Sequence, residues 1–181
     1  MNPLMLLAAA LLLPVPAFAH PGDALSHGLL AGFAHPFSGV DHLLAMVMVG
    51  LWAGLLGGKA QLALPGGFLG GMALGALLGL AGVALPMAGA GILASIIVLG
   101  ALAALAVRPP LVLGVALATG FGLLHGHAHG TELPGGLAML GILGGTAVLH
   151  AAGVVLAQPM RRAAQVAGAA TAVAGLVLAF I

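Results

Sequence analysis

Two short runs of polar residues hold most of the groups in this 181-residue chain that could bind a metal ion. The first run extends from His35 to His42 and includes Asp41, and the second extends from His125 to Glu132. Imidazole and carboxylate groups suit divalent transition metals of borderline hardness. Since the chain has no cysteine, the two runs predict a metal site built from nitrogen and oxygen donors.

The spacing within the second run predicts a binding face on a helix. His125, His129 and Glu132 stand at positions i, i+4 and i+7, which lie on one side of an α-helix. Two imidazoles and a carboxylate would then converge. His127 points away from this face, either as an additional outer ligand or exposed to water. The alternative interpretation of the run is a polar loop that faces water.

The first run combines helix-breaking residues with ligands. Pro36 and Gly39 place His35 just before a turn and put Asp41 and His42 in the first turns of a helix. Broken helices at membrane depth usually line a cavity or a site. Asp41 alone could equally complement a helix dipole, but the neighbouring histidines favour binding. One shared site requires the helices of the two runs to be neighbours; it would comprise His35, Asp41, His42, His125, His129 and Glu132.

Three further residues are secondary metal-binding candidates. Met46 lies one turn below His42 and could offer a softer ligand further in, although such methionines more often fill the core. His150 falls in the inner half of an apolar segment, where an ionisable residue suggests a function or a hydrogen bond to a neighbouring carbonyl. His20 could recruit metal outside the membrane.

The composition predicts an integral membrane protein. Hydrophobic residues make up 62% of the chain and charged residues 4%, whereas soluble domains contain roughly 25% charged residues. Long apolar stretches without two-residue alternation favour an all-α helix bundle over a barrel. The net charge of +1 offers no surface for nucleic acid, so the expected partners are the lipid bilayer and a divalent metal ion.

The first 19 residues resemble a secretory signal peptide. An apolar stretch from Met5 to Pro14 is followed by Ala17-Phe18-Ala19, which has the pattern of a cleavage site. A retained first helix is the alternative. Cleavage would leave a membrane domain of residues 20–181 whose amino terminus lies outside the cytoplasm.

Breaks at glycine, proline and charged residues divide that domain into six segments close to the ~20 residues that span a bilayer. Residues 24–35 are too short to span and predict a surface helix or a re-entrant piece packed on the bundle. Glycines at 66–71 and 75–79 predict close helix packing, with pore lining as the alternative. The six segments are approximately 37–57, 62–85, 88–107, 110–128, 133–157 and 161–180.

The distribution of charge predicts the orientation of the six segments. With the mature amino terminus outside, Lys59, Arg108 and the pair Arg161-Arg162 all fall on the cytoplasmic side, as the positive-inside rule requires. The same topology puts Asp41, Glu132 and seven of the eight histidines near the outer face. Both ends of residues 20–181 then lie outside the cytoplasm.

The two runs together resemble the HupE/UreJ family. The resemblance rests on His35, on Asp41-His42 followed by Leu43-Leu44-Ala45-Met46, and on the run from His125 to Glu132, and it covers nearly the whole chain. Two positions depart from the family pattern, because Leu124 replaces a usual Phe and Gly89 stands where members often have an acid. The resemblance implies a nickel permease that supplies hydrogenase or urease, with the motif residues in its path.

These observations together predict uptake of a divalent metal, with nickel favoured by the resemblance and cobalt and zinc as other substrates, and no enzymatic activity. The chain has no phosphate-binding loop, so transport would be passive or driven by membrane potential or protons. Uptake should fall as the pH drops through the histidine range near ~6.5. The alternatives are a metal-binding accessory or sensor protein for hydrogenase or urease maturation, and an intramembrane metallohydrolase.

Overall fold

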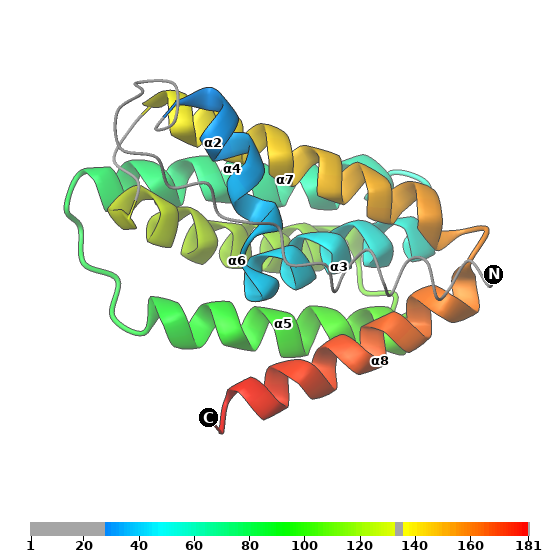
Figure 1. Ribbon diagram of the computed structural model, residues 1–181. Helices are drawn as coiled ribbons and strands as arrows, with labels where there is room; N and C mark the ends of the chain where they lie inside the picture. The colour runs from blue at the N-terminus through cyan, green and yellow to red at the C-terminus, as the bar shows by residue number, and fades with distance from the viewer. Residues whose placement is uncertain (1–27, 133–135, 181) are drawn as a thin grey trace.

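The computed structural model describes residues 28–132 and 136–180. These residues form seven α-helices, one short 3-10 helix and no strand, which confirms the prediction of an all-α fold (Figure 1). The signal peptide predicted at residues 1–19 and the candidate ligand His20 lie outside the described residues. The elements are α2 (Leu29–Ala34), η1 (His35–Phe37), α3 (Val40–Leu56), α4 (Ala60–Leu80), α5 (Ala88–Ala104), α6 (Leu111–Glu132), α7 (Gly136–Ala157) and α8 (Arg161–Leu178).

Several of these helices can cross a membrane. Helices α4, α6 and α7 are each long and apolar enough to span, and the bent pair formed by residues 29–37 and α3 would make a fourth span. Helix α5 is apolar but has only 17 residues. Each of the six predicted segments coincides with one helix from α3 to α8. The chain is therefore a multi-pass membrane protein.

Helix α6 continues further than the sequence predicted. The prediction ended this segment at residue 128, whereas the helix runs to Glu132. Gly130 lies against the backbone of Ala76 on α4, and the Thr131 hydroxyl donates to the carbonyl of Ala128 at 2.8 Å. Because these contacts hold the last turn in helical form, Glu132 remains on the same helix as His125.

The chain bends sharply just before α3. Residues 29–37 and α3 meet at 82°, at a break where Pro36 lies in the short η1 turn and Gly39 is extended. Helix α2 packs on α7, with Gly32 against the backbone of Ala138. Residues 29–34, part of the short piece predicted at residues 24–35, therefore pack on the bundle, and the bend brings His35 beside the start of α3.

Glycines allow α4 and α6 to touch backbone to backbone. A Cβ atom on Gly71 or Gly75 would collide with the α6 carbonyls of Thr119 or Leu123. The packing interpretation is therefore confirmed for these two glycines, whereas Gly66 and Gly70 of the same stretch have no neighbour within 4 Å. The glycines of α6 that lie against α4 in the same way are Gly122, Gly126 and Gly130.

The main helix pairs follow the pattern of an inverted repeat. Helix α3 lies along α7, α4 along α6, and α5 along α8 (Figure 1). An inverted repeat would relate α3 to α6, α4 to α7 and α5 to α8. Under this exchange the pair α3·α7 becomes the pair α6·α4, and the pair α5·α8 is unchanged. Transporters built this way place substrate sites near the interface between the repeats.

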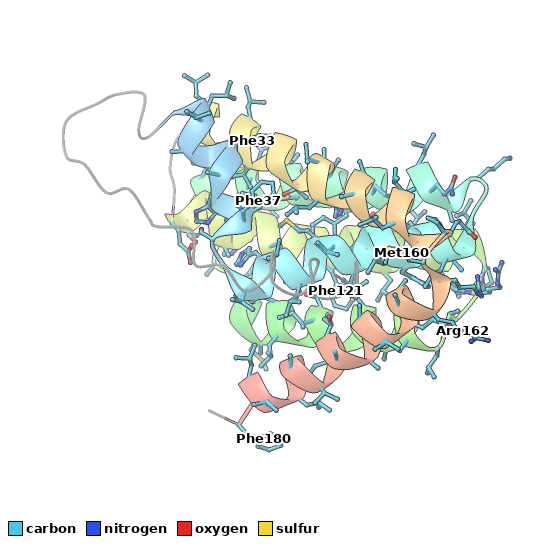
Figure 2. The ribbon with its side chains drawn as sticks, turned by 45° about the vertical axis from the view of Figure 1, so that its right-hand side comes forward. Phe33, Phe37, Phe121, Met160, Arg162 and Phe180 are labelled. Carbon is cyan, nitrogen blue, oxygen red and sulfur yellow. The ribbon has the colours of Figure 1, made fainter. Side chains whose placement is uncertain are left out.

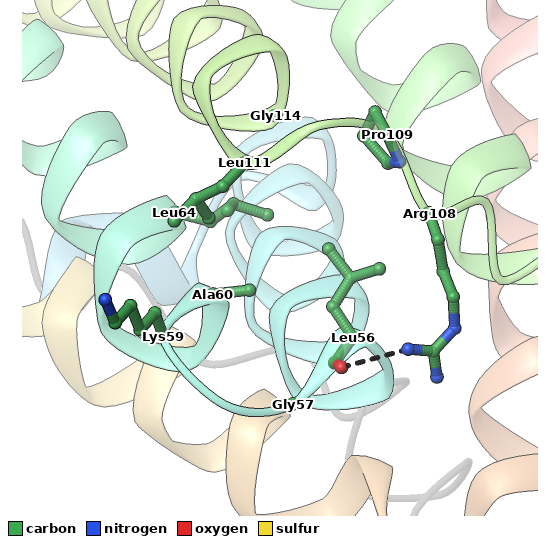
Figure 3. A pocket seen from close by; sticks show the side chains of 9 residues that line it. All are labelled: Leu56, Gly57, Lys59, Ala60, Leu64, Arg108, Pro109, Leu111 and Gly114. Atoms are coloured by element: carbon green, nitrogen blue, oxygen red, sulfur yellow. Dashed lines mark hydrogen bonds between the residues drawn. The ribbon is translucent and has the colours of Figure 1, made fainter.

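One end of the bundle is basic. Figure 2 shows Arg162 at the end away from Phe33. At this end the Arg108 guanidinium donates to the carbonyl of Leu56 at 3.3 Å (Figure 3) and to that of Leu55 at 3.2 Å, and so satisfies carbonyls that the end of α3 leaves free. Beside it is a pocket of about 260 Å³ lined by Leu56, Gly57, Lys59, Ala60, Leu64, Arg108, Pro109, Leu111 and Gly114. The lining contains no histidine or carboxylate, so the metal-binding groups lie elsewhere.

Replacing Gly126 by alanine should loosen the contact between α4 and α6. The added methyl group would meet the Met72 carbonyl, and overpacking of this kind costs about 1–3 kcal/mol. Thermal unfolding of the purified protein in detergent measures the effect. The matched control is Gly120→Ala on the same helix, where nothing lies within 4 Å. An equal loss of stability in both variants would contradict the role assigned to this contact.

Candidate metal site

The two histidine runs meet at the end of the bundle opposite the basic residues. The ring of His129 on α6 lies 4.6 Å from that of His42 on α3 and 5.0 Å from that of His35, measured between ring centroids. The rings of His42 and His125 are 5.0 Å apart. Four imidazoles from helices far apart in the sequence thus form one cluster: His35, His42, His125 and His129. We call it the outer histidine cluster, because the sequence predicted these residues near the outer face.

Both predicted carboxylates lie at the edge of this cluster. Ligand atoms of Glu132, His35 and His129 all lie within 4.8 Å of one another. Asp41 is 44% exposed, and its Oδ1 accepts hydrogen bonds from the Nδ1 and the backbone nitrogen of His42, each at 2.8 Å. Two negative charges at the rim would attract a dication and offset part of the cost of removing its water.

Hydrogen bonds orient two of the four imidazoles. His42 donates its Nδ1 proton to the Asp41 carboxylate, so the Nε2 of the neutral ring carries a lone pair. The Ser95 hydroxyl donates to the carbonyl of Ile92 at 2.6 Å and must therefore accept from the His125 Nε2 at 2.9 Å. The His125 Nδ1 then holds the lone pair. Metal-binding histidines commonly donate their other ring proton in this way.

Four ring nitrogens of the cluster are buried without a partner. The His42 Nε2, the His125 Nδ1 and both nitrogens of His129 have no hydrogen bond among the described residues. Nearly all buried polar atoms in proteins are paired, and an unpaired one costs about 1–3 kcal/mol. A coordinated divalent cation would satisfy the lone-pair nitrogen of each of these three rings, so the donor set fits a transition metal.

The secondary metal-binding candidates lie in two places: His127 under the connection between α4 and α5, and Met46 with His150 between α3 and α7. His127 is 6% exposed, and its Nε2 donates to the Val83 carbonyl at 2.7 Å, so the interpretation as a water-exposed side chain is wrong. The residue is buried because it packs under the connection between α4 and α5. Met46 and His150 are also buried. The Met46 carbonyl accepts a hydrogen bond from the His150 Nδ1 at 2.7 Å, and the Met46 sulfur accepts one from the Thr146 hydroxyl at 3.0 Å.

The sequence did not predict that Ser95 and Phe68 belong to the site. Ser95 orients His125, and the available signal was that it is the one hydroxyl residue in the apolar sequence of α5. The Phe68 ring lies 5.5 Å from the His125 ring and 5.1 Å from the His150 ring. Nothing in the local pattern marked it, since it stands in a glycine-rich stretch that predicts packing.

A pocket opens beside Asp41 between α3, α5 and α8. Its volume is about 300 Å³, and it is lined by Val40, Asp41, Gly89, Ile92, Leu93, Ile96 and Leu178. Gly89, which departs from the pattern that the sequence otherwise resembles, therefore lines the same pocket as Asp41. An acidic side chain at this position would have faced the same pocket.

Comparison with known sequences identifies the family of the chain. The HupE / UreJ protein family matches residues 7–178, which include every residue of the cluster. The chain belongs to this family. Protein HupE of Rhizobium leguminosarum bv. viciae is 44% identical over 181 positions, which cover 94% of this chain and 93% of that protein. No solved structure matches this HupE/UreJ family member.

Ser95→Ala should weaken metal binding without unfolding the protein. The change frees the His125 Nε2 and leaves the orientation of that ring undetermined, and loss of such a partner typically weakens metal affinity about 10–100-fold. Titration calorimetry of the purified protein with Ni²⁺ measures it. Ser95→Thr, which keeps the hydroxyl, is the matched control and should bind nearly as the wild type does. Unchanged affinity in Ser95→Ala would contradict the orienting role.

Proposed function

We propose that this HupE/UreJ family protein takes up divalent nickel across the bacterial inner membrane through the outer histidine cluster. The observation that carries the proposal is the convergence of four imidazoles, three of which have buried nitrogens without partners, with Asp41 and Glu132 at the rim. Cobalt and zinc accept the same ligands. Nickel is favoured because the family resemblance implies supply of that metal to hydrogenase or urease.

The cluster would act by replacing water around the cation. Imidazole nitrogens substitute for water ligands, and the carboxylates of Asp41 and Glu132 neutralise the charge while the ion is partly dehydrated. Once bound, a cation that moves inward gains about 2.3 kcal/mol per charge for each 100 mV of membrane potential. A dication therefore needs no nucleotide hydrolysis to enter.

The charge distribution supports an outer location for the cluster. Lys59, Arg108, Arg161 and Arg162 are all in or beside the connections at the opposite end of the bundle, which the positive-inside rule assigns to the cytoplasm. We propose that all six helices from α3 to α8 span, with the ends of residues 20–181 in the periplasm. The 17 residues of α3 and of α5 reach roughly 25 Å, which requires a locally thinned bilayer.

Removal of one rim carboxylate or one cluster imidazole should abolish most uptake. Asp41→Asn and His129→Ala each remove a ligand at the point where the two runs meet, and we expect uptake of radiolabelled nickel to fall by at least about tenfold. The control is His127→Gln, which retains a donor for the Val83 carbonyl and should transport normally.

Two outcomes separate the candidate functions, and a competition assay identifies the metals that are transported. Wild-type uptake in both Asp41→Asn and His129→Ala would contradict the proposed path. Nickel binding to the purified wild type without any uptake by cells would instead support the accessory or sensor function. Competition by cobalt and zinc in the same assay identifies which cations share the path.

A further inference from the structure

His150 presents a ring nitrogen that nothing else in the described chain uses. Its Nδ1 lies 2.7 Å from the Met46 carbonyl oxygen, which can only accept a hydrogen bond. The proton of the neutral ring is therefore on Nδ1, and the lone pair is on Nε2. This Nε2 is buried and has no hydrogen-bond partner among residues 28–132 and 136–180, and the residue is 1% exposed.

The position of His150 places this nitrogen below the outer histidine cluster. His150 follows the start of α7 at Gly136 by fourteen residues, or roughly 21 Å at 1.5 Å per residue. The Phe68 ring contacts His125 of the cluster, with 5.5 Å between centroids, and meets the His150 ring edge-on at 5.1 Å. One aromatic ring thus bridges the cluster and His150.

Other donors lie beside His150. The Met46 sulfur is fully buried and accepts a hydrogen bond from the Thr146 hydroxyl, which stands one turn before His150 on α7. A thioether and an imidazole are both acceptable ligands for borderline and softer divalent metals. The inner half of the bundle therefore contains a neutral set of donors, in contrast to the outer cluster with its two carboxylates.

We propose that the His150 Nε2 is an inner binding station for the transported dication, which reaches it from the outer histidine cluster past the Phe68 ring. The inference rests on the proposed function and adds a second site to it. A bare charge in the bilayer interior is costly, so a ligand beyond the cluster lowers the barrier to inward movement. A neutral station with few ligands also binds weakly enough for the ion to leave.

A purely structural role for His150 makes a different prediction. The hydrogen bond to the Met46 carbonyl links α3 to α7 and could be the whole purpose of the residue. His150→Asn tests this, because the asparagine amide places a donor near the position of Nδ1 and has no counterpart of Nε2. A structural role predicts normal uptake in this variant, whereas an inner station predicts a loss.

Spectroscopy can detect the cation at position 150 directly. The chain has no cysteine, so His150→Cys introduces a single thiol, and Co²⁺ bound there would give a thiolate-to-cobalt charge-transfer band in the purified protein. The control is Leu149→Cys, one residue away on the same helix and also buried, where we expect no band. Absence of the band in folded His150→Cys, or an equal band in both variants, would overturn the proposal.

Uptake measurements complete the test and separate its failure from that of the proposed function. We expect His150→Asn to bind Ni²⁺ at the outer cluster in calorimetry but to take up radiolabelled nickel on the order of tenfold more slowly. Normal uptake in His150→Asn together with a loss in Asp41→Asn would refute the inner station alone. Normal uptake in both variants would refute the transport path itself.

Discussion

The backbone contact between α4 and α6 is the constraint on which the metal-binding region depends. Gly122, Gly126 and Gly130 form one face of α6, and each fits against an α4 carbonyl with no room for a side chain. His125 and His129 each precede one of these glycines, so the period of one helical turn that creates the contact also spaces the ligands. Since Phe68 is on α4 and both imidazoles are on α6, a wider separation of the two helices would move the Phe68 ring away from the imidazoles.

Hydrogen bonds then decide what these imidazoles can do. His42, His125 and His150 each donate one ring proton to a fixed acceptor: a carboxylate, a serine oxygen and a backbone carbonyl. In each ring the other nitrogen is left buried and free. In these three rings the protein therefore satisfies one nitrogen and leaves the other for a ligand, as the hydrogen-bond partners of metal-binding histidines usually do.

Charge is distributed along the bundle in a way that fits inward passage of a cation. Carboxylates stand at the rim of the outer histidine cluster, neutral donors surround His150, and the four basic residues are in or beside the connections at the far end. Gly89 faces the pocket beside Asp41, so this family member holds fewer charges there than an acidic residue would supply. In the proposed function, the attraction of a dication to the outer histidine cluster then rests on Asp41 and Glu132.

Much of this could be predicted from the sequence, because composition and helical spacing are local properties. The apolar composition required helices whose backbone is satisfied within each segment, and the i, i+4, i+7 spacing put His125, His129 and Glu132 on one face. The tertiary structure alone decided that this face meets His35 and His42, that Ser95 orients His125, and that Phe68 bridges the outer cluster and His150. Those contacts join residues on different helices, and the helix crossings that create them depend on which glycines face a neighbouring helix. Gly71 faces α6 and Gly70 has no neighbour within 4 Å, although the two are adjacent in the sequence.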